Sequence, residues 1–201
     1  MLATTVICYK RKPPMSAHPS SQQLFMIEGY LEREEKAEYK SEYYKGEIFA
    51  MAGGSPRHSD ICGNIYHALR KHLAGKSCRP YNSDMRVHIP ILQYFTYPDV
   101  SVVCGKRESF RDNALMNPVL IIEVLLDSTE GYDRGTKFKL YSKIASLQEY
   151  VLVAQDTRSV DVFRRNAFGR WELFQSSEKE DVALESVGCT LTMDEIYEDA
   201  E

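Results

Sequence analysis

The residue best placed for chemistry in this chain is Glu123, a single carboxylate inside the most apolar run of the sequence, residues 118–126. The run is too short to span a membrane and too rich in β-branched residues for a surface helix. It predicts a central strand that is buried on both faces. A bare carboxylate there costs several kcal/mol unless a metal ion, a basic side chain or a bound proton compensates it, and such groups are typical of catalytic sites.

A second carboxylate, Asp99, opens the preceding predicted strand. If this strand and the one that holds Glu123 are antiparallel neighbours, the two carboxylates converge. With the backbone carbonyl of Val124 they form an oxygen-rich set of the kind that Mg²⁺ or Mn²⁺ prefers. An ion held there stabilises charge on a phosphate and lowers the pKa of an attacking water. The sequence therefore predicts a metal site made of Asp99, Glu123 and Val124.

The helix predicted after Glu123 offers a cation for this site. Asp133, Lys137 and Tyr141 are spaced by four residues and share one helix face. Lys137 is the candidate to reach the metal site and to activate or position a water molecule, Asp133 could orient it, and Arg134 could contact a phosphate. An Asp–Lys pair at this spacing is more often a solvated surface pair, so that alternative stays open.

A histidine, His58, follows a Gly-Gly-Ser-Pro-Arg loop and precedes a predicted helix. It could face the site as a phosphate contact or a proton relay. It could equally cap the helix or pack against its neighbours, which is the commoner use of a lone histidine.

The elements that must position these residues follow from periodicity and turn signals. Residues 1–22 predict a flexible leader, and residues 23–198 predict a single domain. In chain order the patterns predict a helix over 24–36, a hairpin over 38–52, a helix over 59–74, strands over 85–91, 97–103 and 118–126, a helix that begins between 127 and 133 and ends near 145, a strand over 149–154, a hairpin of 160–164 with 171–175, and a short helix or tail from 194. This order favours an α/β fold with a mixed sheet that helices cover on both faces.

Composition limits the partners. The 201 residues carry a net charge of −4, so binding to nucleic acid through overall charge is not expected, and any contact with DNA needs a local basic cluster. The candidates for such a cluster are Arg57 with His58, Lys106 with Arg107 and Arg111, and Arg134 with Lys137, Lys139 and Lys143.

The cysteines predict the compartment. The five cysteines are odd in number and form no Cys-x-x-Cys pair, which argues against a zinc ribbon and against a disulfide framework. With no stretch long enough to span a bilayer, the sequence predicts a protein of the reducing cytoplasm.

Taken together, these segments resemble the PD-(D/E)XK nuclease superfamily, and more closely its Uma-type family of restriction-endonuclease-like proteins, once described as a domain of unknown function. The resemblance covers roughly residues 24–198. It rests on Gly46-Glu47-Ile48, Met51–Ser55, His58, Pro98-Asp99, Ile122-Glu123-Val124-Leu125, Ser128-Thr129, Asp133-Arg134, Lys137 and Glu149–Val153.

The resemblance implies a fold and an activity. The fold is a restriction-endonuclease-like core, a mixed central β-sheet flanked by helices, with an added N-terminal helix-hairpin and a C-terminal β-hairpin. The activity is Mg²⁺-dependent (or Mn²⁺-dependent) hydrolysis of phosphodiester bonds in DNA. The superfamily places its lysine two residues after the glutamate, where this chain has Leu125, so the resemblance implies that Lys137 of the next helix supplies it. It also makes Glu47 a candidate for an additional metal ligand, although an exposed hairpin charge explains Glu47 as well.

Cleavage of duplex DNA often needs two sites that act together, which favours a homodimer. Two rivals to the nuclease remain open. One is a catalytically inactive module on the same fold that binds nucleic acid or protein. The other is a metal-dependent hydrolase of small phosphoesters.

Overall fold

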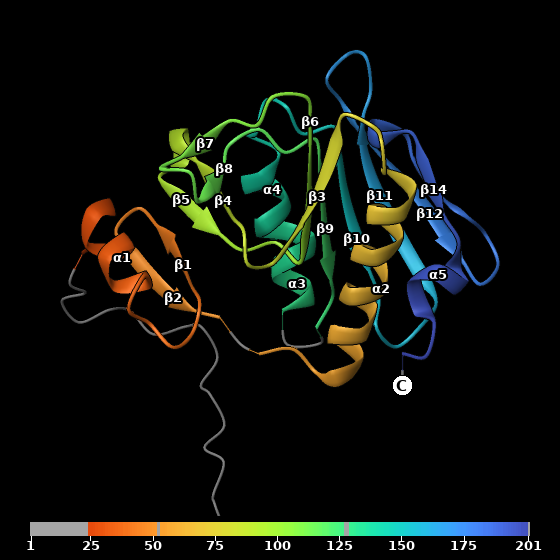
Figure 1. The fold of residues 1–201 in the computed structure, drawn as a ribbon, viewed down its shortest axis with the longest axis horizontal. Helices are drawn as coiled ribbons and strands as arrows, with labels where there is room; N and C mark the ends of the chain where they lie inside the picture. The colour runs from red at the N-terminus through yellow and green to blue at the C-terminus, as the bar shows by residue number, and fades with distance from the viewer. Residues whose placement is uncertain (1–23, 52, 127–128, 201) are drawn as a thin grey trace, which may run out of the picture.

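The computed structural model describes residues 24–51, 53–126 and 129–200 (Figure 1). The predicted leader, residues 1–22, and the positions of Asp127 and Ser128 lie outside these residues.

A six-stranded mixed sheet forms the centre of the fold, in the order β12-β11-β10-β9-β6-β3. Only the pair β9–β10 is parallel, and the other neighbours are antiparallel. The predicted buried strand is β9; it lies between β6 and β10, and all five of its residues are buried. The strands are β3 (Cys78–Asn82), β6 (Val100–Cys104), β9 (Leu120–Val124), β10 (Glu149–Val153), β11 (Ser159–Arg165) and β12 (Trp171–Ser177).

A second six-stranded sheet, in the order β2-β1-β5-β4-β8-β7, lies beside the central one (Figure 1). The predicted N-terminal hairpin forms one edge of it, and a separate two-stranded sheet, β13–β14, follows the C-terminal hairpin. These strands are β1 (Ser41–Tyr44), β2 (Glu47–Ala50), β4 (Arg86–Ile89), β5 (Tyr94–Thr96), β7 (Ser109–Phe110), β8 (Ala114–Leu115), β13 (Val182–Leu184) and β14 (Cys189–Leu191).

Helices cover both faces of the central sheet. The helix α2 packs with α5 on one face, where Ile61 and Ile65 meet the valines of β6 and β10. On the other face, Tyr141 and the residues after it pack between the central sheet and the second sheet. The helices are α1 (Ile27–Glu34), α2 (Pro56–His72), α3 (Glu130–Tyr132), α4 (Phe138–Tyr141) and α5 (Met193–Tyr197), and 3₁₀ turns lie at Pro90–Leu92 and Glu185–Val187. None of the helices in the described ranges is long and apolar enough to cross a membrane.

The mixed α/β architecture is confirmed, but two details differ from the sequence prediction. The helix expected from about residue 130 to 145 is divided: a π-helical segment, Asp133–Lys137, separates α3 from α4. The short strands β3, β5, β7, β8, β13 and β14 were not predicted. Most of them have only two or three residues, too few to show a periodicity.

The sequence argues against a disulfide framework, but the described part of the structure contains one disulfide. Cys78 on β3 is bonded to Cys104 on β6. The two residues lie directly opposite each other in the antiparallel pair of strands, although 26 positions separate them in the sequence. Spacing along the chain does not show this, because the register of two distant strands brings the thiols together.

A buried histidine in the second sheet makes the stability of this fold sensitive to acidic pH. His88 is only 4% exposed, its ring stacks on Phe95 at 3.9 Å, and neither ring nitrogen has a hydrogen-bond partner in the described residues. Burial lowers the pKa of His88 to about 4. The unfolded chain therefore binds the proton more tightly than the folded chain, and stability is lost as the pH falls from about 6.5 towards 4.

We expect this effect to reach about 2 kcal/mol in the free energy of unfolding. The measurement is urea denaturation at neutral and at acidic pH for the wild type and for His88→Phe, which keeps the aromatic stack and removes the proton site. The difference between the two pH values should be smaller in His88→Phe. The variant His67→Phe, at an exposed position on α2, serves as the control; equal pH sensitivity in all three proteins would contradict the assignment.

Candidate active site

Asp99 and Glu123 meet where β6 begins and β9 ends. The two strands are antiparallel, with Val100 opposite Ile122, so the residue before the first and the residue after the second lie at the same end. The backbone N–H of Val124 donates a hydrogen bond of 2.8 Å to Asp99 Oδ2. Glu123 is 3% exposed. The antiparallel arrangement on which the predicted convergence depended is therefore present.

Lys137 compensates the buried carboxylate. Its Nζ lies 2.9 Å from Glu123 Oε1 and 3.3 Å from Asp133 Oδ1. Both Lys137 and Asp133 are buried, so their pair is not the solvated surface pair that the spacing alone would favour. They sit at the two ends of the π-helical segment, a local distortion that is frequent at functional sites.

Three further side chains belong to this cluster. The sequence placed Tyr141 on the helix face of Lys137 without giving it a role, and it did not identify Thr96 or Glu42. The hydroxyl of Tyr141 donates to Glu123 Oε1 at 2.8 Å. Thr96 on β5 donates to Glu42 Oε1 at 2.5 Å, and its hydroxyl oxygen lies 3.4 Å from that of Tyr141. Glu42 is a buried carboxylate on β1. The only sign of Glu42 in the sequence is a charge within a tyrosine-rich segment. The pairing of β1 with β5 places it beside Thr96.

Glu47, the hairpin acid predicted as a supporting ligand, lies elsewhere. It stands opposite Tyr44 next to the turn and lines a shallow pocket with Phe25 and Arg33. It makes no side-chain hydrogen bond or ion pair with the described residues, and the hairpin acid that joins the cluster is Glu42. Arg134, predicted as a phosphate contact, is paired with Glu130 and Asp161, which compete with a phosphate for its guanidinium.

The electrostatics of the cluster favour an added cation. Burial, together with the charges of Asp99 and Asp133, raises the pKa of Glu123 to about 8 against the opposing effect of Lys137. Burial alone would lower the pKa of Lys137, but Glu123 and the other acidic neighbours outweigh it, so its pKa lies above the ordinary value. One ammonium group thus faces several carboxylates.

The donor set fits a hard divalent ion. The hydrogen bonds and ion pairs of the two central carboxylates use Asp99 Oδ2 and Glu123 Oε1. Their second oxygens, Oδ1 and Oε2, make none within the described ranges. Carboxylate and carbonyl oxygens are the ligands that Mg²⁺ and Mn²⁺ select, so Asp99, Glu123 and the Val124 carbonyl would hold such an ion.

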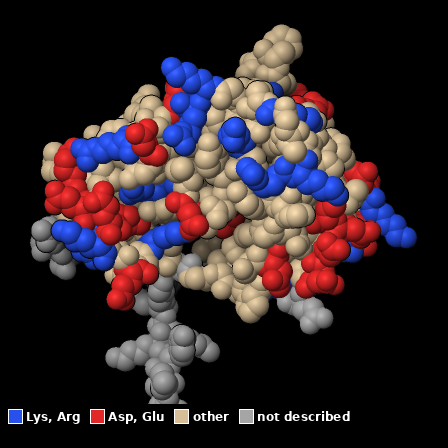
Figure 2. Space-filling model, in the orientation of Figure 1, with Lys and Arg blue, Asp and Glu red and all other residues tan. Residues whose placement is uncertain are grey.

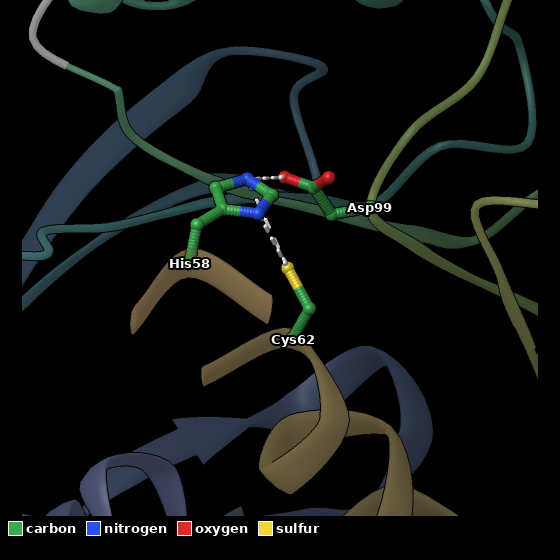
Figure 3. A group of neighbouring side chains, drawn as sticks. All are labelled: His58, Cys62 and Asp99. Carbon is green, nitrogen blue, oxygen red and sulfur yellow. Dashed lines mark hydrogen bonds and ion pairs between the residues drawn. The ribbon is translucent and has the colours of Figure 1, made fainter. Parts of the chain in front are cut away.

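His58 is held beside Asp99 by the start of α2. The Ser55 side chain caps this helix by accepting from the His58 backbone N–H at 3.0 Å. The ring Nε2 lies 3.3 Å from Asp99 Oδ2, and Nδ1 lies 3.5 Å from Cys62 Sγ (Figure 3). Burial lowers the pKa of His58, but the hydrogen bond and charge of Asp99 outweigh burial, so the pKa is raised above its usual value. A Cβ on Gly54 would lie 2.6 Å from His58 Nδ1, so only glycine fits there without moving the ring.

One face of the molecule carries mixed charge. Figure 2 shows basic and acidic side chains interspersed on the visible face instead of one continuous basic face. One hollow beside α2 and β3 is nevertheless strongly basic. It is lined by Tyr66, Arg70, Arg79, Pro80, Tyr81, Val103, Gly105 and Arg107.

Known proteins with similar sequences match most of the chain. The uncharacterized protein slr1290 of Synechocystis sp. is 39% identical over 170 residues, which cover 85% of this chain and 90% of that protein. The uncharacterized protein sll1609 of the same organism is 37% identical over 147 residues, 72% of this chain and 82% of that protein.

A solved structure shares the fold. It is described as a putative nuclease belonging to DUF820 from Anabaena variabilis, and it aligns with a TM-score of 0.69 over 88% of this chain and 99% of that one, at 18% identity. The family model Uma2, described as "Putative restriction endonuclease", matches residues 27–194. The chain therefore belongs to the Uma2 family, as the resemblance implied.

Proposed function

We propose that the protein is a metal-dependent endonuclease that hydrolyses phosphodiester bonds in DNA. The observation that carries the proposal is the buried cluster at the meeting point of β6, β9 and the π-helical segment. There Glu123 lies beside Lys137, and Asp99 accepts from the backbone N–H of Val124, the residue after Glu123. Membership of the Uma2 family supports a nuclease-like role.

The residues of the cluster have distinct tasks in this proposal. When bound, the divalent ion supplies positive charge at the scissile phosphate and a water of lowered pKa. Lys137 positions the attacking water through its ammonium group and stabilises negative charge that develops at phosphorus. Asp133 fixes Lys137 through the 3.3 Å contact, and Tyr141 fixes the Glu123 carboxylate by donating to Oε1, the oxygen that also faces Lys137. His58 is close enough to Asp99 to hold or pass a proton there.

Contact with the DNA backbone needs local positive charge, because the net charge of the chain is −4. The basic hollow lined by Arg70, Arg79 and Arg107 supplies it. The hollow includes Val103, while Asp99 precedes the other end of the same strand, so the two lie about 13 Å apart along β6. This distance allows one duplex to touch both.

A homodimer would bring two such sites to the two DNA strands. The C-terminal hairpin is a candidate dimer face because it carries aromatic residues. Phe163 and Trp171 pack against Phe138 inside the protomer, whereas Phe174 is 43% exposed. Phe168, Leu173 and Phe174 are therefore the exposed apolar side chains of this hairpin that remain available to a second copy.

The test of the proposal is cleavage of supercoiled plasmid with Mg²⁺ or Mn²⁺. We expect the wild type to nick the plasmid and Asp99→Asn to be slower by about 100-fold or more, because the ion loses one of its charged ligands. The control is Asp60→Asn, an exposed position on α2, which should match the wild type.

Equal nicking by all three proteins would reject the site. DNA binding without cleavage by the wild type would instead identify the inactive binding module. Cleavage of a small phosphodiester without cleavage of the plasmid would identify the hydrolase of small phosphoesters.

A further inference from the structure

A group of three potential metal ligands lies next to the candidate active site, and the proposed nuclease chemistry leaves one of them unused. His58, Cys62 and Asp99 each offer a ligand atom, and these atoms all lie within 4.8 Å of one another. In Figure 3 the His58 ring lies between the carboxylate and the thiol. Cys62 has no part in the Asp99–Glu123–Lys137 cluster, so its position beside the histidine needs its own explanation.

The distances fit one small ion. His58 Nε2 lies 3.3 Å from Asp99 Oδ2 and 3.9 Å from Cys62 Sγ. With bond lengths of about 2.3 Å to sulfur and about 2.0 Å to nitrogen and oxygen, a tetrahedral centre separates sulfur from nitrogen by about 3.6 Å and nitrogen from oxygen by about 3.3 Å. These two separations therefore require shifts of only a few tenths of an ångström, and the thiol and carboxylate ligand atoms lie within 4.8 Å of each other.

The local structure holds the ligands in this arrangement. His58 and Cys62 are four residues apart in the first half of α2, a spacing that places two side chains on one helix face, as in zinc-binding helices. Gly54 packs close to the Nδ1 side of the imidazole, which leaves Nε2 as the nitrogen that faces Asp99. Three protein ligands leave a fourth position for water.

The donor types select a class of ion. Thiolate and imidazole suit Zn²⁺ and its neighbours among the transition metals, whereas Mg²⁺ prefers oxygen ligands only. The same three residue types also occur in Cys-His-Asp nucleophilic sites. Here, however, the thiol is partly buried and faces the charges of Asp99 and Glu123, which disfavour a bare thiolate. A divalent cation bound between the three groups reverses that penalty.

We infer that His58, Cys62 and Asp99 form a second metal site, which takes Zn²⁺ or a similar transition-metal ion. As the ion binds, the Sγ–metal bond forms and the thiol proton leaves to solvent. Asp99 would also hold the catalytic ion, so the two sites compete for one carboxylate. A transition metal at the second site then inhibits cleavage; this consequence, unlike the site itself, rests on the proposed function.

Binding is tested with Co²⁺, which reports thiolate ligation through a charge-transfer band in the near ultraviolet. Full-length protein, freed of metal by a chelator without reductant, is titrated with Co²⁺. We expect one equivalent to produce the band in the wild type and in Cys189→Ser, the control at the other free cysteine of the described residues, and no band in Cys62→Ser.

A matched pair of histidine variants tests the second ligand. We expect His58→Ala to weaken Co²⁺ binding by at least about tenfold, and His67→Ala, an exposed position on the same helix, to leave it unchanged. Thermal melting checks that each variant is folded. Absence of the band from the folded wild type, or its persistence in Cys62→Ser, would overturn the second metal site.

The inhibition is measured separately, by adding Zn²⁺ to plasmid cleavage and comparing each protein with its own rate in Mg²⁺ alone. Stronger inhibition of the wild type than of Cys62→Ser supports competition at Asp99, and equal inhibition contradicts it. A Cys62-dependent Co²⁺ band in a protein that cleaves no plasmid would support the second metal site and reject the nuclease.

Discussion

The change Glu123→Gln is expected to slow metal-dependent DNA cleavage by about 100-fold or more while the free energy of unfolding stays equal or rises. The loss of activity follows from removing a charged ligand of the ion. The gain in stability follows from burial: Glu123 is 3% exposed and shares Lys137 with other carboxylates, so removing its charge relieves repulsion. Glutamine can still accept from Tyr141 and Lys137 through its carbonyl oxygen.

The account of the Glu123 charge also predicts how the free energy of unfolding changes with pH. Burial raises the pKa of Glu123 from 4.5 to about 8, so the folded chain binds the proton more tightly than the unfolded chain. The wild type therefore loses stability as the pH rises through this range, and the loss should be smaller in Glu123→Gln. Urea denaturation of the wild type and of Glu123→Gln between pH 4.5 and about 8 measures this loss of stability. The variant Glu32→Gln, at an exposed position, serves as the control.

A Glu123→Gln protein that cleaves at the wild-type rate would reject Glu123 as a ligand. A variant that is clearly less stable than the wild type near pH 8 would reject the account of its charge, because the buried carboxylate would then be stabilising the fold.

The change Lys137→Met is expected to lower the free energy of unfolding by about 3–5 kcal/mol, because it leaves the carboxylates of Glu123 and Asp133 buried without their cation. Lys139→Met, an exposed position two residues further along, serves as the control and should change little. Urea denaturation of both variants measures the difference.

A double-mutant cycle separates this charge effect from lost packing. If the buried charge causes the instability, adding Glu123→Gln to Lys137→Met should restore part of the stability, because it removes a carboxylate that has no partner. Equal stability of Lys137→Met and Lys139→Met, or independence of the two changes in the cycle, would contradict the assignment.

The sequence by itself determined the centre of the protein. The apolar run around Glu123 required a buried strand, and a carboxylate in such a strand required a compensating group. The spacing of Asp133, Lys137 and Tyr141 placed all three on one helix face. These inferences held because each depends on residues close together in the chain, where local geometry is fixed by the periods of strand and helix.

Only the tertiary structure decided which distant residues join that centre. Glu42 enters the cluster and Glu47 does not, because β1 pairs with β5 in one register. Cys78 and Cys104 meet through the register of β3 and β6. His58 and Cys62 reach Asp99 because α2 packs across the sheet at the start of β6. Strand register and helix packing depend on many weak contacts between residues that are distant in the sequence. A local sequence pattern therefore does not predict them.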